Sequence, residues 1–167
     1  FKLKLAQDLA RRGAFFYQDV TVDDSSKELA NKLLDGAIAS LVQIRGQINE
    51  QALDSAIELY ESCSRVELYG SGGSAVVAED AQLKFFRLGK PAIAYSDPHI
   101  QHAAAALLDK DTLVIAISHS GRRIDILKTV GIAKQSKAKV ISVAATRSPL
   151  AQVSDVALTV DVNEDSD

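Results

Sequence analysis

The stretch TLVIAISHSG, residues 112–121, decides the fold of this 167-residue chain. Residues 113–117 form a continuous apolar run, which is typical of a strand that helices cover on both faces. The polar loop Ser-His-Ser-Gly follows at 118–121, and residues 122–136 then show helical periodicity. A buried strand, a polar loop and a helix in this order indicate one unit of an α/β fold.

The same order of strand and helix recurs along the chain from Arg65 onward. Alternating β and α segments favour a parallel sheet with right-handed crossovers. We therefore expect a three-layer α/β/α sandwich, a doubly wound, flavodoxin-like fold around a five-stranded parallel sheet. The strands are predicted at 65–69, 91–95, 112–117, 139–144 and 156–162, and the helices between them at 74–88, 99–108, 122–136 and 149–153.

Two further helices are predicted before the first strand. Ser25 and Glu28 match a capping box at the start of one of them, which extends to about Gly46. Asn49 is a fair N-cap for the other, whose apolar face extends to Tyr60. The pair carries more apolar positions than one sheet face needs, so we expect an isologous homodimer.

The two ends of the chain suggest a fragment of a longer protein. The chain begins at Phe1 without a methionine and stops at Asp167, soon after a strand-like run. We interpret residues 1–24 as a lead-in helix or linker from a missing N-terminal domain. Residues 25–167 would then form the main domain, with a C-terminal helix missing.

The composition is that of a globular domain, with 47% hydrophobic and 25% charged residues. The net charge of −3 gives no general reason to expect nucleic-acid binding. One cysteine excludes an internal disulfide, and three histidines without metal-ligand spacing predict no metal site. We find no apolar run near the ~18 residues of a membrane span and no signal peptide, and so expect a cytoplasmic protein without a cofactor or a membrane partner.

Two loops carry the functional prediction, Gly-Ser-Gly-Gly-Ser at 70–74 and the loop at 118–121. In a 2-1-3-4-5 strand order, strands one and three are neighbours, and ligands bind where the chain leaves them in opposite directions. Each loop opens a helix, whose first turn presents free N–H groups and a positive dipole end to a phosphate. The candidate ligand residues are Gly72, Gly73, Ser74, Ser118, His119, Ser120, Gly121 and Arg123, with Ser71 as a weaker candidate.

A purely structural interpretation stays open for these residues. Serines commonly cap helices that follow strands, so Ser74, Ser118 and Ser120 need no ligand to explain them. His119 is either a donor to an anion or simply exposed. Arg123 and its neighbour Arg122 have side chains that usually remain in water.

Three motifs resemble the SIS, or sugar isomerase, domain across about residues 65–162. They are Gly-x-Gly-x-Ser at 70–74, Ile-Ser-x-Ser-Gly at 117–121 and Ser-Pro-Leu-Ala at 148–151. The whole chain is similar to the effector domain of RpiR-type transcription regulators. The resemblance implies that Ser74 and the residues of 118–120 hold the phosphate of a sugar phosphate or phosphorylated sugar acid, without catalysis. It also implies that DNA is bound only through an N-terminal helix-turn-helix domain, which this chain lacks.

Among such regulators, the chain is most similar to those of sugar catabolism. This resemblance implies 2-keto-3-deoxy-6-phosphogluconate, an Entner–Doudoroff intermediate, as the ligand. The second loop departs from the family pattern, because Arg123 and Asp125 stand where a threonine and a glutamate are common. An arginine can still grip a phosphate or carboxylate through two hydrogen bonds.

Two enzymatic alternatives remain. An aldose–ketose phosphosugar isomerase needs a base beside the carbonyl, for which His119, Asp125 and Glu79 are candidates. A dinucleotide-binding oxidoreductase is suggested by Gly70-x-Gly72-x-x-Ala75, with Asp97 22 residues further on. That fingerprint is weak alone, and the serine-rich second loop suits a phosphate better than a nicotinamide.

Overall fold

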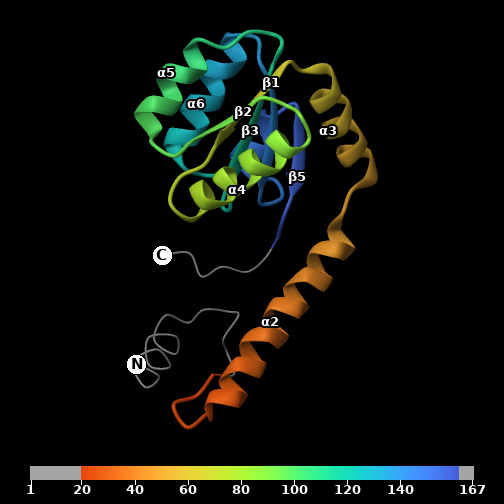
Figure 1. The fold of residues 1–167 in the computed structure, drawn as a ribbon, viewed down its shortest axis with the longest axis vertical. Coiled ribbons are helices and arrows are strands. Elements are labelled where there is room, and N and C mark those ends of the chain that lie inside the picture. Colours follow the sequence, from red (N-terminus) through yellow and green to blue (C-terminus); the bar gives the residue numbers. More distant parts are fainter. Residues whose placement is uncertain (1–19, 162–167) are drawn as a thin grey trace. The chain divides into compact units, whose positions relative to one another are not determined.

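The computed structural model describes residues 20–161, which fall into two compact units (Figure 1). One unit comprises 20–47 with Asp161, and the other comprises 48–160. The helical pattern that the sequence shows within 2–17 lies outside the described residues, as does the end of the strand predicted at 156–162.

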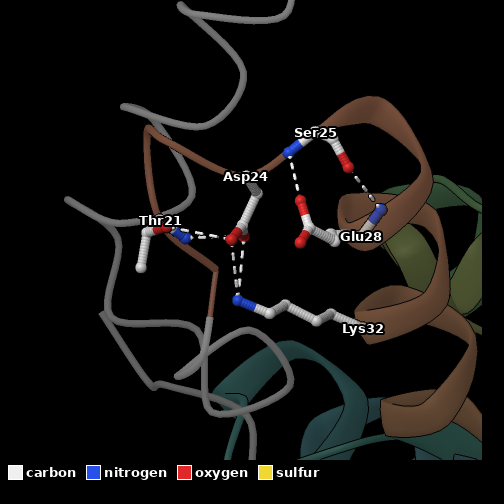
Figure 2. A network of polar contacts seen from close by, with 5 residues as sticks. All are labelled: Thr21, Asp24, Ser25, Glu28 and Lys32. Atoms are coloured by element: carbon white, nitrogen blue, oxygen red, sulfur yellow. Dashed lines mark hydrogen bonds and ion pairs between the residues drawn. The ribbon is translucent and has the colours of Figure 1, made fainter.

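The first unit contains the helix α2, Ser26–Gln47, which begins at the predicted capping box. The Ser25 amide donates to Oε2 of Glu28 at 2.7 Å, and the Glu28 amide donates to Oγ of Ser25 at 3.2 Å. Figure 2 shows these two reciprocal bonds at the helix start. The prediction is confirmed, because both bonds satisfy amides that the helix itself leaves unpaired.

Asp24 continues this polar network on the side of the preceding turn (Figure 2). Its carboxylate accepts the amide of Thr21 at 2.8 Å and the ammonium group of Lys32 at 2.9 Å. The hydrogen bond from Lys32, followed by that from the Thr21 backbone, lowers the pKa of Asp24 to about 2. The entry to α2 is thus held by charged hydrogen bonds as well as by the capping box.

The second unit is a five-stranded sheet in the order β2-β1-β3-β4-β5, with every neighbouring pair parallel. This confirms the predicted fold class and strand order. The strands are β1 Arg65–Tyr69, β2 Ala92–Tyr95, β3 Thr112–Ser118, β4 Lys139–Ala144 and β5 Val156–Thr159. The helices are α3 Glu50–Ser62, α4 Gly73–Arg87, α5 Pro98–Ala106, α6 Ile124–Gln135 and α7 Pro149–Val153.

Helices cover both faces of this sheet, which makes the three predicted layers. On one face α5, α6 and α7 pack against strand residues such as Val114 and Val140. On the other face α3 and α4 pack against residues such as Leu68 and Leu113. Figure 1 shows α5 and α6 side by side on their face. All seven residues of the central strand β3 are buried, as the continuous apolar run predicts.

Three predicted boundaries are wrong by two or three residues, namely the end of β5, the start of α6 and the end of α5, which stops at Ala106 and not at 108. The strand β5 ends at Thr159, because its partner β4 ends at Ala144, the residue paired with Thr159. The Val160 amide makes the last bond of this pair of strands, to the Ala144 carbonyl. The helix α6 begins at Ile124 and not at 122, since the extended backbone of Arg123 (φ −63°, ψ 128°) lies before its first turn. The second loop is therefore longer than the sequence pattern indicates.

Candidate anion-binding site at the ends of β1 and β3

The two predicted loops follow neighbouring strands of the sheet. β1 pairs with β3 in a register that sets Tyr69 opposite Ala116, so both strands end at the same edge. From there the chain continues to β2 on one side and to β4 on the other. The loops at 70–74 and 118–123 thus flank the point at which the sheet changes direction, where α/β folds bind ligands.

The helices that these loops open have no side-chain cap. The N-cap residue of α4 is Gly72, which has no side chain to accept a bond, and that of α6 is Arg123, whose guanidinium group has no acceptor atom. The first turn of a helix has amides without intrahelical partners and lies at the positive end of the helix dipole. Two uncapped helix starts at one sheet edge therefore form a favourable setting for an anion.

The other helices of the described residues are capped by a side chain. Ser25 caps α2, and Asn49 accepts the Ala52 amide of α3 at 3.0 Å. Asp97 accepts two amides of α5, and Ser148 accepts the Ala151 amide of α7 at 3.2 Å. Between residues 20 and 161, a missing cap is thus a property of the two helices at the switch point.

The first loop is tightly folded onto the start of α4. A Cβ atom at Gly70 would lie 2.3 Å from the carbonyl oxygen of Ser74, so only glycine fits there. Ser71 donates a long hydrogen bond of 3.4 Å to the Ser96 carbonyl, in the loop after β2. Gly72 and Gly73 are exposed, and Ser74 is half-buried in the first turn of α4.

The second loop is held by the segment that follows β4. The carbonyl of His119 accepts the Ala145 amide at 2.9 Å, and the carbonyl of Gly121 accepts the Leu150 amide at 3.0 Å. Gly121 has a φ of +60°, and a Cβ atom there would lie 2.3 Å from Oγ of Ser148. Backbone bonds and a close glycine contact therefore determine the shape of this loop.

The polar side chains of the second loop differ in exposure. Ser118 is buried at the end of β3, His119 is half-buried, and Ser120 is exposed. Ser120 Oγ accepts the Arg122 amide at 3.4 Å, a bond that leaves its hydroxyl proton able to donate to a ligand. Arg123 is exposed, and its Nη2 lies 3.6 Å from Oδ2 of Asp125.

The structure also bears on the alternative roles. Ser74 lies inside the first turn of α4 and does not cap it, so the structural explanation by capping does not hold for this residue. Asp97, the carboxylate of the dinucleotide fingerprint, uses Oδ1 to cap α5. Glu79 is exposed on α4. In the described part of the chain, no three His, Cys, Asp or Glu side chains group as metal ligands would.

The sequence pattern missed Gln101 of α5, which is fully buried against the first loop. Polar residues stand near it on the same helix, at His99 and His102, so no pattern in the sequence distinguished Gln101. Across residues 20–161, no helix is long and apolar enough to cross a membrane.

A family model described as the SIS domain matches residues 58–166. The chain belongs to the SIS domain family. The match includes both loops, so the switch-point edge described above is part of the shared domain.

Two relatives extend the similarity of this SIS domain over nearly the whole chain. The chain is 40% identical over 161 residues to the Bifunctional protein glk of Burkholderia orbicola (strain AU 1054), covering 96% of this chain and 25% of that protein. It is 33% identical over 167 residues to the HTH-type transcriptional regulator HexR of Escherichia coli (strain K12), covering 58% of that protein. The chain thus spans a quarter and somewhat over half of these relatives.

Two solved structures share the fold of the SIS domain. The Vibrio vulnificus NanR protein complexed with ManNAc-6P superposes with a TM-score of 0.78 at 22% identity, covering 96% of this chain and 56% of that one. The sugar isomerase domain of an RpiR transcription factor from Sphaerobacter thermophilus gives 0.77 at 21% identity, covering 83% and 78%.

Proposed function

We propose that this SIS domain senses a sugar phosphate for a transcription regulator of carbohydrate catabolism, with 2-keto-3-deoxy-6-phosphogluconate as its ligand. The observation that carries the proposal is the pair of uncapped helices, α4 and α6, at the switch point of a sheet whose other described helices are capped. A phosphate is the anion that best uses two such helix starts, because its oxygens accept several amide and hydroxyl bonds at once.

The relatives support the same proposal. HexR is named as a transcriptional regulator, and NanR shares the fold of this chain in a complex with ManNAc-6P. We assign the phosphate to Ser74, Ser118, His119 and Ser120, and the carboxylate of the sugar acid to Arg123. Residues 1–24 would lead in from a helix-turn-helix domain outside this chain, residues 25–167 would form the sensing domain, and the protein would act in the cytoplasm.

Titration calorimetry tests the proposal. The chain is titrated with 2-keto-3-deoxy-6-phosphogluconate, with glucose 6-phosphate as a sugar phosphate without a carboxylate, and with inorganic phosphate. We expect the three ligands to bind with affinity falling in that order. Absence of heat and of thermal stabilisation with all three would refute the sugar-phosphate site.

An aldose–ketose isomerase is the second candidate, favoured by the position of His119 in the loop that leads from β3 to the uncapped helix α6. We propose binding without turnover, because the other candidate bases are poorly suited. Glu79 is exposed on α4, and Asp125 faces the positive charge of Arg123. Incubation with aldose and ketose phosphates should leave both sugars unchanged, and interconversion that His119→Ala abolishes would favour the isomerase.

We also propose that the protein forms a homodimer through α2. Leu34, Ile38, Leu41 and Val42 form one stripe at helical spacing, and each is more than half exposed. Such a stripe favours pairing with the same surface of a second copy. Sedimentation should show a dimer for the wild type and for Ala39→Glu, which lies off the stripe, and a monomer for Ile38→Glu/Leu41→Glu.

A further inference from the structure

The start of the first loop is held by a buried side chain, that of Gln101. This residue of α5 is fully buried, and its Nε2 donates to the carbonyl of Gly70 at 2.9 Å and to the carbonyl of Tyr95 at 2.7 Å. Because both partners are acceptors, the amide must present its nitrogen to them. One side chain thus ties the end of β1 to the end of β2 at the edge where the loop begins.

The other atom of the same amide makes the arrangement costly. Oε1 of Gln101 is buried and has no hydrogen-bond partner among the described residues. A buried polar atom without a partner opposes folding, and a methionine of similar shape would avoid the penalty. The hydrogen bonds that its nitrogen donates to the Gly70 and Tyr95 carbonyls therefore explain why a glutamine stands at this position.

We propose that Gln101 is a positioning residue for the anion site, an inference that rests on the proposed function. A loop that binds an anion through its amides must turn its carbonyl oxygens away from the ligand. Gln101 holds the Gly70 carbonyl on the side of α5, just before residues 71–74. Gly70 packs directly against the Ser74 backbone, so the orientation of its peptide is transmitted to the start of α4.

The variant Gln101→Met tests this role, because it keeps the volume and removes both donated bonds. The control is Thr112→Val, which removes the hydrogen bond of 2.7 Å that the buried Thr112 donates to Asp109 at the opposite end of β3. Both variants should unfold at a lower temperature than the wild type, by roughly 2–8 °C. Only Gln101→Met should weaken binding of 2-keto-3-deoxy-6-phosphogluconate, by about tenfold, while the protein remains folded.

The outcomes separate the two proposals. If the wild type binds neither 2-keto-3-deoxy-6-phosphogluconate nor inorganic phosphate, the proposed function and this inference both fail. If the wild type binds and folded Gln101→Met binds equally well, or if Thr112→Val loses as much affinity, only the role of Gln101 is refuted.

A measurement on the wild type covers the case in which Gln101→Met does not fold. The side-chain amide protons of Gln101 should exchange slowly with solvent in NMR spectra, and their resonances should shift when 2-keto-3-deoxy-6-phosphogluconate saturates the site. Rapid exchange of these protons, or resonances that do not shift at saturation, would contradict the inference.

Discussion

The loops after β1 and β3 contain the same kinds of residue but are held in place differently. A side chain holds the start of the first loop, since the amide nitrogen of Gln101 donates a hydrogen bond to the Gly70 carbonyl. The second loop is tied by the backbone, since the amides of Ala145 and Leu150 bind the carbonyls of His119 and Gly121. Each loop also contains one glycine in close contact with a neighbour.

This difference determines which substitutions each loop tolerates. Backbone bonds remain when side chains change, so the second loop depends on side chains mainly where Gly121 meets Ser148. The first loop depends more on a side chain, because the backbone bond from the Gly70 amide to the Tyr95 carbonyl is long, at 3.4 Å, and the Gln101 amide holds the Gly70 carbonyl. Gly70 also packs on the backbone of α4. The two glycine contacts therefore give the sharpest test of the comparison.

The largest effects are expected from alanine at the two glycines. Gly121→Ala brings its Cβ to 2.3 Å from Oγ of Ser148 at a φ of +60°, and should lower the free energy of unfolding by about 2–4 kcal/mol. Gly70→Ala brings its Cβ to 2.3 Å from the Ser74 carbonyl oxygen and should be comparably destabilising. Chemical denaturation measures stability, and calorimetry should show no phosphosugar binding by either variant.

Second-site changes distinguish the two contacts. Ser148→Gly removes the side-chain atoms with which the new Cβ of Gly121→Ala would clash. The free energy of unfolding of the double variant should therefore exceed the value expected from adding the losses of the two single variants, by about 1 kcal/mol or more. Ser74→Gly leaves the backbone oxygen in place and should not rescue Gly70→Ala. Equal rescue in both pairs would show that the loops are not held differently.

The next largest effect concerns the hydroxyls that face the proposed phosphate. A hydrogen bond to a charged group contributes about 1.5–3 kcal/mol, so Ser74→Ala or Ser120→Ala should weaken phosphosugar binding by roughly tenfold to a hundredfold. Neither serine caps a helix, so the unfolding midpoint without ligand should move little. Calorimetric titration and thermal melts of the same samples provide both values.

The double variant tests whether both loops hold one phosphate. If they do, Ser74→Ala/Ser120→Ala should deviate from the sum of the single losses. Additive losses would indicate two separate contacts, and undiminished affinity in all three variants would remove both serines from the site.

Much of this fold was predictable because the signals are local. The continuous apolar run of β3 and the cap at Asn49 each appear within a few residues of sequence, and the structure confirms both. The alternation of β and α segments predicted a parallel sheet, and the choice of a flavodoxin-like fold predicted the strand order, which placed the two loops at one edge. Strand ends were less predictable, since β5 stops where its partner β4 stops.

The supports of the loops were not predictable, because they come from residues distant in sequence. Gln101 lies 31 residues after Gly70 in the sequence, and no sequence pattern around either residue indicates the hydrogen bond between them. Pro149 at the first helical position marks Ser148 as the cap of α7, but nothing in the sequence shows that Ser74 caps no helix. The missing caps distinguish α4 and α6 only because the other four described helices, α2, α3, α5 and α7, have side-chain caps.

A smaller effect is expected at the charged rim of the second loop. Arg123 is exposed and already faces Asp125 at 3.6 Å, so its contribution to a carboxylate ligand is reduced by solvent and by that neighbour. Arg123→Gln should weaken binding of 2-keto-3-deoxy-6-phosphogluconate by about fivefold and binding of glucose 6-phosphate less. The control Lys128→Gln removes an exposed charge further along α6 and should leave both affinities unchanged. Equal losses for the two ligands would mean that Arg123 does not recognise the carboxylate.

The smallest effect is a gain in stability from a cap that the site helices lack. Arg123 has the extended backbone of an N-cap residue, but its side chain accepts nothing from α6. Serine at this position can accept an amide of the first turn, so Arg123→Ser should raise the free energy of unfolding by about 0.5–1 kcal/mol above that of Arg123→Gln. Both variants lose the same charge, so the difference between them isolates the cap.

The same pair predicts an opposite change in affinity. If the amides at the start of α6 bind the phosphate, a serine that occupies one of them competes with the ligand. Arg123→Ser should then bind 2-keto-3-deoxy-6-phosphogluconate more weakly than Arg123→Gln while being more stable without it. Thermal melts and calorimetry of the two variants measure both quantities. A stabilised Arg123→Ser that binds as well as Arg123→Gln would show that the uncapped start of α6 has no part in holding the anion.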